Sequence, residues 1–294
     1  MKPYLYAFDV NAIFGRAFPH TDKRVKSGVV NPKDYLDGNP VYALRETLRI
    51  IRSEVNAVER MGLPNTHIVM VCDHPGKNFR HDLFSDYKFN RPPKSEERRY
   101  QESVLPEMLK AAGYPVLCID AVEADDVLAT LSTKLSSLGI GVTVFTGDKD
   151  LMSLCDEHTT IYNGKIKKLL HEVDVKRKFG VSGELVLDLL SLAGDSVDNV
   201  PGVKGISEKS AAELLTQMTL DDIINTPDKI LATNLKLRKS ICNNLKADPE
   251  TAILSRKLVA LKCDVALGMN FNEMVFTGPN KDAFLPGFFE LESY

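Results

Sequence analysis

Residues 4–9 read YLYAFD, a short apolar run that ends in an aspartate, and this pattern is the main indication of the fold class. It recurs twice: HIVMVC leads directly into Asp73, and VTVFTG leads into Asp148. Short apolar runs of this kind predict buried strands of a parallel sheet. The predicted strands are residues 4–8, 68–72, 116–119 and 142–145.

Helical patterns separate these strands. Apolar residues recur at three- and four-residue steps from Val41 to Val58, and residues 122–138 also have a helical pattern. This alternation predicts an α/β fold with a mostly parallel central sheet flanked by helices. After about residue 170 the strand signals fade, so we expect an α/β core over 1–175 and a helical region over 176–294. Later helices are expected at 185–192, 208–218 and 229–244.

The composition excludes several classes of protein. With 44% hydrophobic and 26% charged residues in 294, the chain is neither disordered nor collagen-like. No apolar run approaches the roughly 20 residues that a membrane helix needs, and MKPYLYAFDV is not typical of a signal peptide. Five scattered cysteines without C-x-x-C fit free thiols in a reducing compartment. We therefore expect a cytoplasmic protein without membrane contact.

Nine carboxylates lie at or near the ends of the predicted strands. They are Asp9, Asp73, Glu123, Asp125, Asp126, Asp148, Asp150, Asp195 and Asp198. Ligands of open α/β sheets bind at the carboxyl ends of the strands, so these acids are expected in one cleft. A single aspartate there is ordinarily a turn residue or helix cap, and acids also favour a helix N-terminus.

Nine acids in one place would repel one another unless cations held them. Oxygen ligands favour hard ions such as Mg²⁺ or Mn²⁺, and no histidine or cysteine cluster competes for the role. Two such ions about 4 Å apart would clamp the attacking and leaving oxygens of a phosphodiester displacement. The acids therefore indicate phosphodiester chemistry.

Five motifs, in order, resemble those of the 5′–3′ exonuclease and flap endonuclease family. They are FDVNAIFGRAF, VCDHPGKNFRHDLFSDYKFNR, VEADDVLA, FTGDKDL and AGDSVDNVPGVKGISEKSAAELL. The similarity covers residues 4–217. The members of the family that this sequence resembles are the nuclease domain of bacterial DNA polymerase I and stand-alone phage and bacterial enzymes. The resemblance implies a PIN-like nuclease core and cleavage of DNA from or near a 5′ end, including flaps, in replication or repair.

The resemblance also assigns the acids. It implies two ions, with the water-activating one held by Asp9, Asp73, Glu123 and Asp125. The ion on the leaving-group side would be held by Asp148, Asp150 and Asp198, with Asp125 as a bridging option. Asp126 and Asp195 would lie further from the ions. No acid of the family's set is missing, which argues against a non-catalytic relative.

The stretch after Asp73 matches the family's basic active-site residues. Arg80, Lys88 and Arg91 would stabilise the charge of the scissile phosphate, and Tyr87 would stack on an unpaired terminal base. In the family this region, here about 78–106, forms an arch over the active site. Pro92 and Pro93 predict a loop followed by a helix. The alternative is a solvated charged loop.

A second element, at about 185–217, resembles the family's helix-hairpin-helix, which binds duplex DNA and often K⁺. Gly202 and Gly205 supply a tight turn, Ser207 caps the next helix, and backbone amides there would hold a phosphate. Lys204 and Lys209 lie nearby. The family usually has glycine where Ser207 stands, so the K⁺ site stays open. The alternative is a helix–turn–helix packing corner.

The net charge of −3 argues against a nucleic-acid partner only until the nine acids are set aside. The 37 Lys and Arg residues then outnumber the remaining acids, as salt-sensitive DNA binding requires. We expect a nucleoid-associated monomer that acts on DNA with 5′ ends, flaps or junctions, or on RNA–DNA primers. The alternatives are a non-catalytic junction-binding protein and an RNase H-like primer-removing nuclease. The apolar tail FLPGFFELESY is expected to pack against the sheet, or else to dock a partner.

Overall fold

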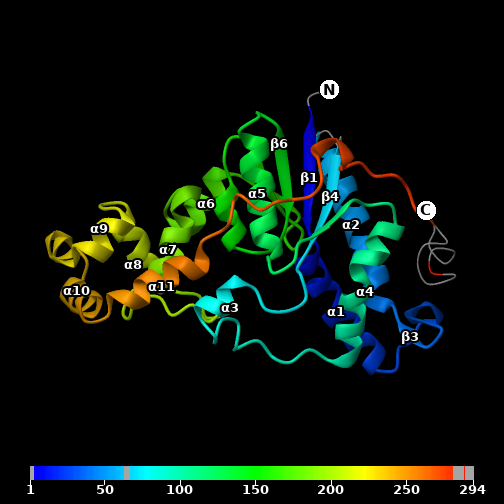
Figure 1. Cartoon of the computed structure of the whole chain (residues 1–294), viewed down its shortest axis with the longest axis horizontal. Coiled ribbons are helices and arrows are strands. Elements are labelled where there is room, and N and C mark those ends of the chain that lie inside the picture. Colours follow the sequence, from blue (N-terminus) through cyan, green and yellow to red (C-terminus); the bar gives the residue numbers. More distant parts are fainter. Residues whose placement is uncertain (1–2, 63–66, 281–287, 289–294) are drawn as a thin grey trace.

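The computed structural model describes residues 3–62, 67–280 and 288 (Figure 1). Within them, one six-stranded sheet has the order β5-β4-β1-β6-β7-β8. Its strands are β1 (Tyr4–Asp9), β4 (His67–Cys72), β5 (Val116–Cys118), β6 (Gly141–Phe145), β7 (Thr159–Asn163) and β8 (Lys168–Leu170). A small antiparallel pair consists of β2 (Tyr35–Leu36) and β3 (Asn39–Pro40).

Parallel pairing defines the centre of the sheet. Ala7 of β1 lies opposite Val69 of β4 on one side and Val144 of β6 on the other. Only β8, at the edge, runs antiparallel within the described sheet. The predicted parallel sheet is confirmed, and all four predicted strands are present. The sequence analysis did not predict β7 and β8.

Helices cover both faces of the sheet and extend to one side of it. Those near the sheet are α1 (Val10–Lys26), α2 (Tyr42–Arg60), α4 (Glu96–Ala111), α5 (Ala124–Ser136) and α6 (Glu172–Phe179), whereas α3 (Phe79–Leu83) lies beside the helical region. The helical region contains α7 (Val186–Ala193), α8 (Glu208–Leu215), α9 (Leu220–Asn225), α10 (Arg238–Ala247) and α11 (Pro249–Val259). Short 3₁₀ turns lie at Pro32–Asp34, Asp150–Leu154, Gly183–Leu185, Pro227–Ala232 and Phe271–Glu273.

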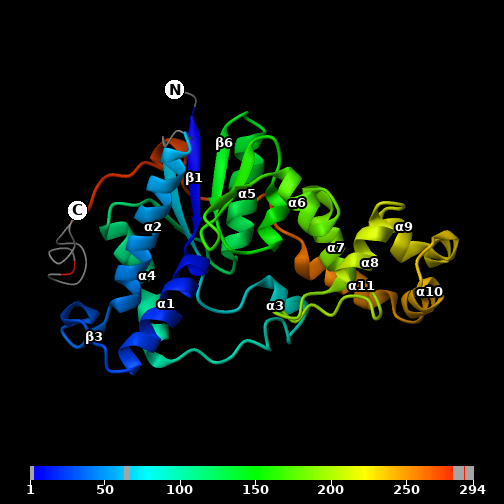
Figure 2. The same ribbon diagram turned by 180° about the vertical axis from the view of Figure 1, so that it is seen from behind.

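Alternate residues of each central strand face different cores. Leu5 and Ala7 of β1 pack in the cluster that includes α5, whereas Tyr6 and Phe8 pack with α1, α2 and α4. Figures 1 and 2 show these helices on opposite faces of the sheet. Burial on both faces explains why the strands are continuous apolar runs.

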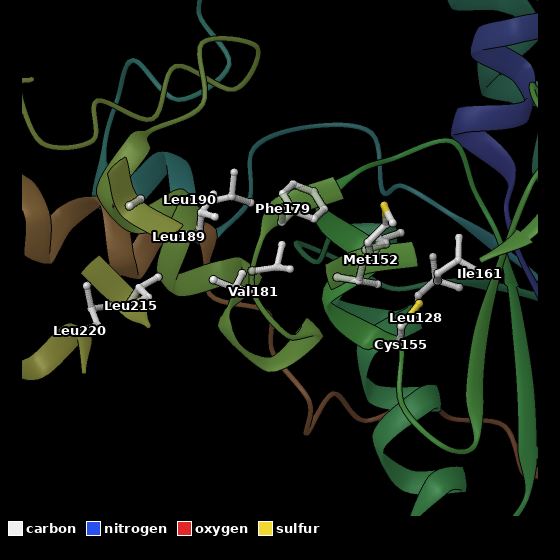
Figure 3. Close-up of a cluster of buried hydrophobic side chains, with 14 of the residues drawn as sticks. Leu128, Met152, Cys155, Ile161, Phe179, Val181, Leu189, Leu190, Leu215 and Leu220 are labelled. Carbon is white, nitrogen blue, oxygen red and sulfur yellow. The ribbon is translucent and has the colours of Figure 1, made fainter. Parts of the chain in front are cut away.

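The α5-side core continues into the helical region without a break. Leu128 of α5 and Ile161 of β7 belong to the same buried cluster as Leu189 of α7 and Leu215 of α8 (Figure 3). Shared burial therefore fixes the helical region relative to the edge of the sheet, which is where the predicted site lies.

One helix prediction was wrong. Residues 229–244 were expected to form one helix, but a 3₁₀ turn over Pro227–Ala232 ends at Thr233 and α10 begins only at Arg238. The Thr233 hydroxyl donates to the Ile230 carbonyl and accepts from the Leu235 amide. Such local side-chain bonds compete with helical ones and break the helix.

A long connection crosses below the carboxyl edge of the sheet. Residues 84–95 join α3, which packs against α11, to α4, which packs against α2 (Figures 1 and 2). Pro92 and Pro93 lie in this connection, and α4 begins after Ser95, whose hydroxyl accepts from the Arg98 amide. The predicted loop followed by a helix is confirmed.

Most of the C-terminal tail lies outside the described residues. Phe288 is the part of it that the structure describes, and it is buried in the cluster with α1 and α2. Its carbonyl accepts a hydrogen bond from Arg45, whose guanidinium also lies over the ring. No helix within the described residues combines the length and apolarity that crossing a membrane requires.

The hairpin before α8 yields a stability prediction. Gly202 and Gly205 both have positive φ, at 62° and 89°, so alanine is strained at either position. A Cβ at Gly202 would also lie 2.4 Å from the Gly194 nitrogen, whereas at Gly205 the nearest atom is 3.6 Å away. We expect Gly202→Ala to lower the free energy of unfolding in urea by roughly 2–3 kcal/mol and Gly205→Ala by about 1 kcal/mol. Equal losses would contradict the close approach of the two backbones.

Candidate active site

Four of the nine predicted acids line one cleft with a volume of about 320 Å³: Asp9, Asp73, Asp125 and Asp148. They come from different elements, because Asp9 ends β1, Asp73 follows β4, Asp148 follows β6, and Asp125 lies in the first turn of α5. Since β4, β1 and β6 are neighbours and parallel, their carboxyl ends meet at one edge of the sheet.

Backbone amides and a hydroxyl hold two of these carboxylates in place. Asp9 caps α1 by accepting from the Ala12 amide at 2.9 Å, and it also accepts from the Thr146 hydroxyl at 2.7 Å. Asp73 accepts from the Ala124 amide at 2.8 Å. Asp9 is thus a helix cap and a cleft acid at once, because its two oxygens serve different partners.

The positions of Asp9, Asp73 and Asp125 are unfavourable for the ionised forms of these carboxyl groups. Burial, with added repulsion from Asp73 and Asp148, raises the pKa of Asp9 from 3.8 to about 7. Burial also raises the pKa of Asp73, and it raises that of Asp125 well above the usual value with help from Asp148 and Asp9. A cation in the cleft would favour the ionised forms of all these groups.

The chemistry of the donor set fits a hard divalent ion. The cleft offers carboxylate oxygens, and no histidine or cysteine lines it. Among the described residues, however, no three potential ligands are already gathered into a group that would hold an ion. The protein therefore provides acids around an open space, and water or substrate oxygens would have to complete the coordination.

Asp150 and Asp195 lie beside the cleft and do not line it. Burial, then repulsion from Asp148 and Asp195, raises the pKa of Asp150 to about 7. One buried oxygen of Asp150 has no hydrogen-bond partner within the described structure. Asp195 forms an ion pair with Lys149 at 3.2 Å and accepts from the Val197 amide. Asp150 thus keeps an uncommitted oxygen, whereas Asp195 is occupied.

Two further acids are paired with the predicted basic residues. Lys88 forms ion pairs with Glu123 and, at 3.8 Å, with Asp198. Arg91 contacts Asp198 at 2.5 Å. Lys88 and Arg91 also line the acid cleft, so the structure brings these cations to the predicted place. Burial alone would raise the pKa of Glu123, but Lys88 and Arg80 hold it below its usual value.

Backbone contacts lock this basic stretch against the hairpin. The Lys88 amide donates to the Asp198 carbonyl at 3.0 Å, and the Asn199 side chain donates to the Asp86 carbonyl at 2.7 Å. Lys88 and Asn199 both have positive φ, at 59° and 57°. This backbone conformation is unfavourable for most residues other than glycine, and the hydrogen bonds between the two segments hold both residues in it.

The expected role of Tyr87 needs correction. Its side chain was expected to stack on a base, but Tyr87 is only 5% exposed and its hydroxyl donates to Glu123 and Asp198. The ring packs edge-on against His81. Neither face of the ring is open to a base in this structure, because the side chain is buried and Lys88 lies over the ring.

The expected role of Arg80 needs a similar correction. It was expected to grip a phosphate, but its side chain is 2% exposed. Its guanidinium makes two hydrogen bonds of 2.8 Å to Asp126, one to Glu123, and others to the carbonyls of Leu258 and Ala260. Asp126 is fully buried in the same ion pair and faces no open space. In this structure Arg80 and Asp126 are therefore partners in a buried ion pair and do not line the cleft, so their contact with a ligand stays a prediction.

Sequence reasoning missed several residues of the cleft. Asn11, Lys94, Arg98 and Glu102 line it, and Thr146 holds Asp9. The Asn11 side-chain oxygen accepts from the Asp73 amide at 2.8 Å. Asn11 and Thr146 stand inside the quoted motifs next to predicted acids, which was an available signal. Glu102 lies outside every motif, and it reaches the cleft only because α4 packs beside it.

The hairpin has the local structure that the sequence predicts. Ser207 caps α8, because its hydroxyl accepts from the Ser210 amide at 3.2 Å. Gly202 and Gly205 make the turn with positive φ. Lys204 and Lys209 are exposed, and the Lys204 carbonyl accepts from Asn244 of α10. DNA contacts by these residues stay a prediction.

The buried role of Arg80 can be tested by stability. In Arg80→Ala the carboxylate of Asp126 stays buried without its cation and that of Glu123 keeps only Lys88, so we expect a loss of about 3–5 kcal/mol in the free energy of unfolding. Arg91→Ala removes an ion pair of a half-exposed arginine and should cost less than about 1 kcal/mol. Urea unfolding measures both. If the two variants lose the same free energy, Arg80 is not the anchor described.

The raised carboxyl pKa values predict how stability depends on pH. The folded protein binds a proton at Asp9 up to about pH 7, whereas the unfolded chain releases it near 3.8. The contribution of Asp9 to stability is therefore greatest below pH 4 and declines as the pH rises through 7. In EDTA, the melting temperature of Asp9→Asn relative to the parent should increase from pH 5 to pH 8. A constant difference would contradict the burial of an unpaired charge at Asp9.

The sequence matches two family profiles over most of its length. Residues 4–180 match "5′-3′ exonuclease, N-terminal resolvase-like domain", and residues 181–282 match "5′-3′ exonuclease, C-terminal SAM fold". The chain is 36% identical over 257 residues to DNA polymerase I of Pseudomonas aeruginosa, covering 87% of this chain but only 28% of that protein. It thus spans less than a third of that polymerase's length.

Shorter relatives match over most of both chains. A 5′-3′ exonuclease of Buchnera aphidicola is 35% identical, with 82% of this chain and 78% of that protein covered. Flap endonuclease Xni of Vibrio parahaemolyticus is 33% identical, with 88% and 94% covered.

The fold is also similar to that of T5 5′-exonuclease with bound divalent zinc ions. The TM-score is 0.69 at 20% identity, with 88% of this chain and 90% of that chain covered. A bacteriophage T5 flap endonuclease in complex with DNA and metal ions gives a TM-score of 0.64 at 22% identity, covering 88% and 89%. With both profiles matched along nearly the whole sequence, the chain belongs to the 5′–3′ exonuclease family.

Proposed function

We propose that this protein is a divalent-metal-dependent, structure-specific 5′ nuclease that hydrolyses DNA phosphodiesters as a 5′–3′ exonuclease and flap endonuclease. The observation that carries the proposal is the composition of one cleft. Asp9, Asp73, Asp125 and Asp148 line it together with Lys88 and Arg91. Acids for metal ions and cations for a phosphate thus surround the same space.

The cleft acids would hold the ions. We propose Asp9, Asp73, Asp125 and Asp148 as ligands of two Mg²⁺ ions, with Mn²⁺ as the alternative. Asp150 is a further candidate through its unpartnered oxygen. When bound, such ions supply an activated water and neutralise charge on the phosphate oxygens. Glu123 and Asp198 could join only after releasing Lys88 and Arg91.

The basic side chains would position the scissile phosphate. Lys88 and Arg91 are paired with Glu123 and Asp198 and also face the cleft. A phosphate entering the cleft would compete with these two acids for the same cations. Arginine can grip a phosphate with two N–H groups, whereas lysine acts as a point charge. The 84–95 connection crosses the same edge of the sheet, as a guide for a single strand would.

We propose a division of labour along the chain. Residues 1–175 would cut, with residues 78–106 as the arch, and residues 176–294 would hold duplex DNA through the hairpin at 185–217. Exposed Lys204 and Lys209 and the cap of α8 support phosphate contact there. A K⁺ ion at the hairpin is part of this proposal. So are a role in replication or repair, action on RNA–DNA primers, and a monomeric state.

The test measures cleavage of a labelled 5′ flap DNA with Mg²⁺ and with EDTA. Asp73→Asn should cut at least about a thousandfold more slowly than the parent, because removing a ligand forfeits several kcal/mol of charge stabilisation. Asp120→Asn is the matched control: Asp120 also follows a strand, its side chain is 95% exposed, and it does not line the cleft. That variant should cut normally.

Two outcomes would decide against the proposal. Rapid cutting by Asp73→Asn would remove the metal site from this cleft. Tight flap binding by the parent without cutting, in either Mg²⁺ or Mn²⁺, would favour a non-catalytic junction-binding protein. That second function has one observation on its side, since no described group of three ligands is already assembled.

A further inference from the structure

A second cavity, of about 280 Å³, lies on the face of the sheet that α1 and α2 cover. Four cations line it: Arg16, Arg49, Arg60 and Lys167. Glu54 is the one acid among its lining residues. It shares no residue with the acid cleft. The excess of positive charge marks it as a place for an anion.

A buried ion pair forms the floor of this cavity. Arg16 contacts Glu54 at 2.6 Å, with side-chain exposures of 20% and 8%. Burial raises the pKa of Glu54 even though Arg16 opposes the shift. The backbone of Gly164 lies directly against the pair, since a Cβ there would come within 1.7 Å of a Glu54 oxygen. The floor is therefore a fixed part of the fold.

The other three cations form the rim, and all three residues are exposed. Arg49 binds Glu46 on its own helix, and Arg60 donates one hydrogen bond to the Asn56 carbonyl. An arginine has five N–H donors in a planar fork, so both keep donors for a ligand. Lys167 approaches from the β7–β8 turn. Cations from one helix, α2, and from the β7–β8 turn thus line the opening above the Arg16–Glu54 pair.

The cavity lies beside the same edge of the sheet as the acid cleft. Gly164 follows β7, which is parallel to β1 and two places away from it in the sheet order. At a strand spacing of about 4.8 Å, the ends of the two strands are roughly 10 Å apart. Lys165, from the same turn, passes within 3.6 Å of where a Cβ of Gly147 would lie, next to Asp148.

We propose that this cavity binds a phosphate group of the DNA strand, at a point a few nucleotides from the acid cleft. Phosphates follow one another along a strand every 3.4 Å of helix axis, so sites about 10 Å apart lie within the span of a few nucleotides. Guanidinium forks match the geometry of phosphate oxygens. The proposal extends the function given above, since it assigns the cavity to the same substrate.

The test is the salt dependence of DNA binding, measured in EDTA so that no cleavage occurs. The slope of log K against log salt should decrease in magnitude in Arg49→Gln and in Arg60→Gln, by at most about 0.9, because the two arginines contribute to the same phosphate contact. Lys110→Gln is the matched control. Like Arg49, Lys110 pairs with an acid three residues earlier on an exposed helix face, but it does not line the cavity.

Identical slopes in the parent, both arginine variants and the control would overturn the proposal. A free nucleotide carries the same phosphate group. The melting temperature of the protein is therefore also measured with and without deoxythymidine 5′-monophosphate. Protection of the parent but not of Arg49→Gln, with unchanged slopes, would assign the cavity to free nucleotides and overturn the DNA assignment. Changed slopes in a protein that fails to cut with Mg²⁺ would support this cavity and refute only the nuclease function.

Discussion

Parallel pairing of β1 with β4 and β6 is the constraint on which this structure depends. It forces the side chains that follow three strands into one small volume, and three of these are carboxylates: Asp9, Asp73 and Asp148. Burial and repulsion raise the pKa of Asp9 and Asp73. Backbone amides and a threonine hydroxyl offset part of this cost. The protein's own groups therefore do not fully compensate the cost of ionising the cleft acids, and a cation in the cleft would lower that cost.

Arg80 neutralises a different set of acids, which does not line the cleft. A single buried guanidinium joins α5, through Asp126 and Glu123, to the carbonyls of Leu258 and Ala260 at the end of α11. Removing two carboxylates and a cation from water is expensive, and the bidentate geometry with added hydrogen bonds is what offsets it. Arg80 thus joins α3, the start of α5 and the end of α11 at one point.

The ion pairs of Lys88 and Arg91 are less buried than those of Arg80. Unlike Arg80, the two cations face the cleft while contacting Glu123 and Asp198, so these ion pairs lie at the border between the core and solvent. Two residues with positive φ, Lys88 and Asn199, form the hydrogen bonds that join the 84–95 connection to the hairpin there. In the proposed function, a metal ion would compete for the carboxylates of these ion pairs, and a phosphate would compete for their cations.

The central strands, the acids at their ends, the loop at Pro92 and the Ser207 cap follow from the sequence alone, because each depends on the order of neighbouring residues. Which four of the nine acids line one cleft depends on the packing of distant elements. Only the tertiary structure decided that Arg80 pairs with Asp126, 46 positions away, and that Tyr87 is buried. It also decided where the second cavity lies. Sequence spacing gives the direction of a side chain along one element, whereas the partner of a charge depends on which distant elements pack beside it.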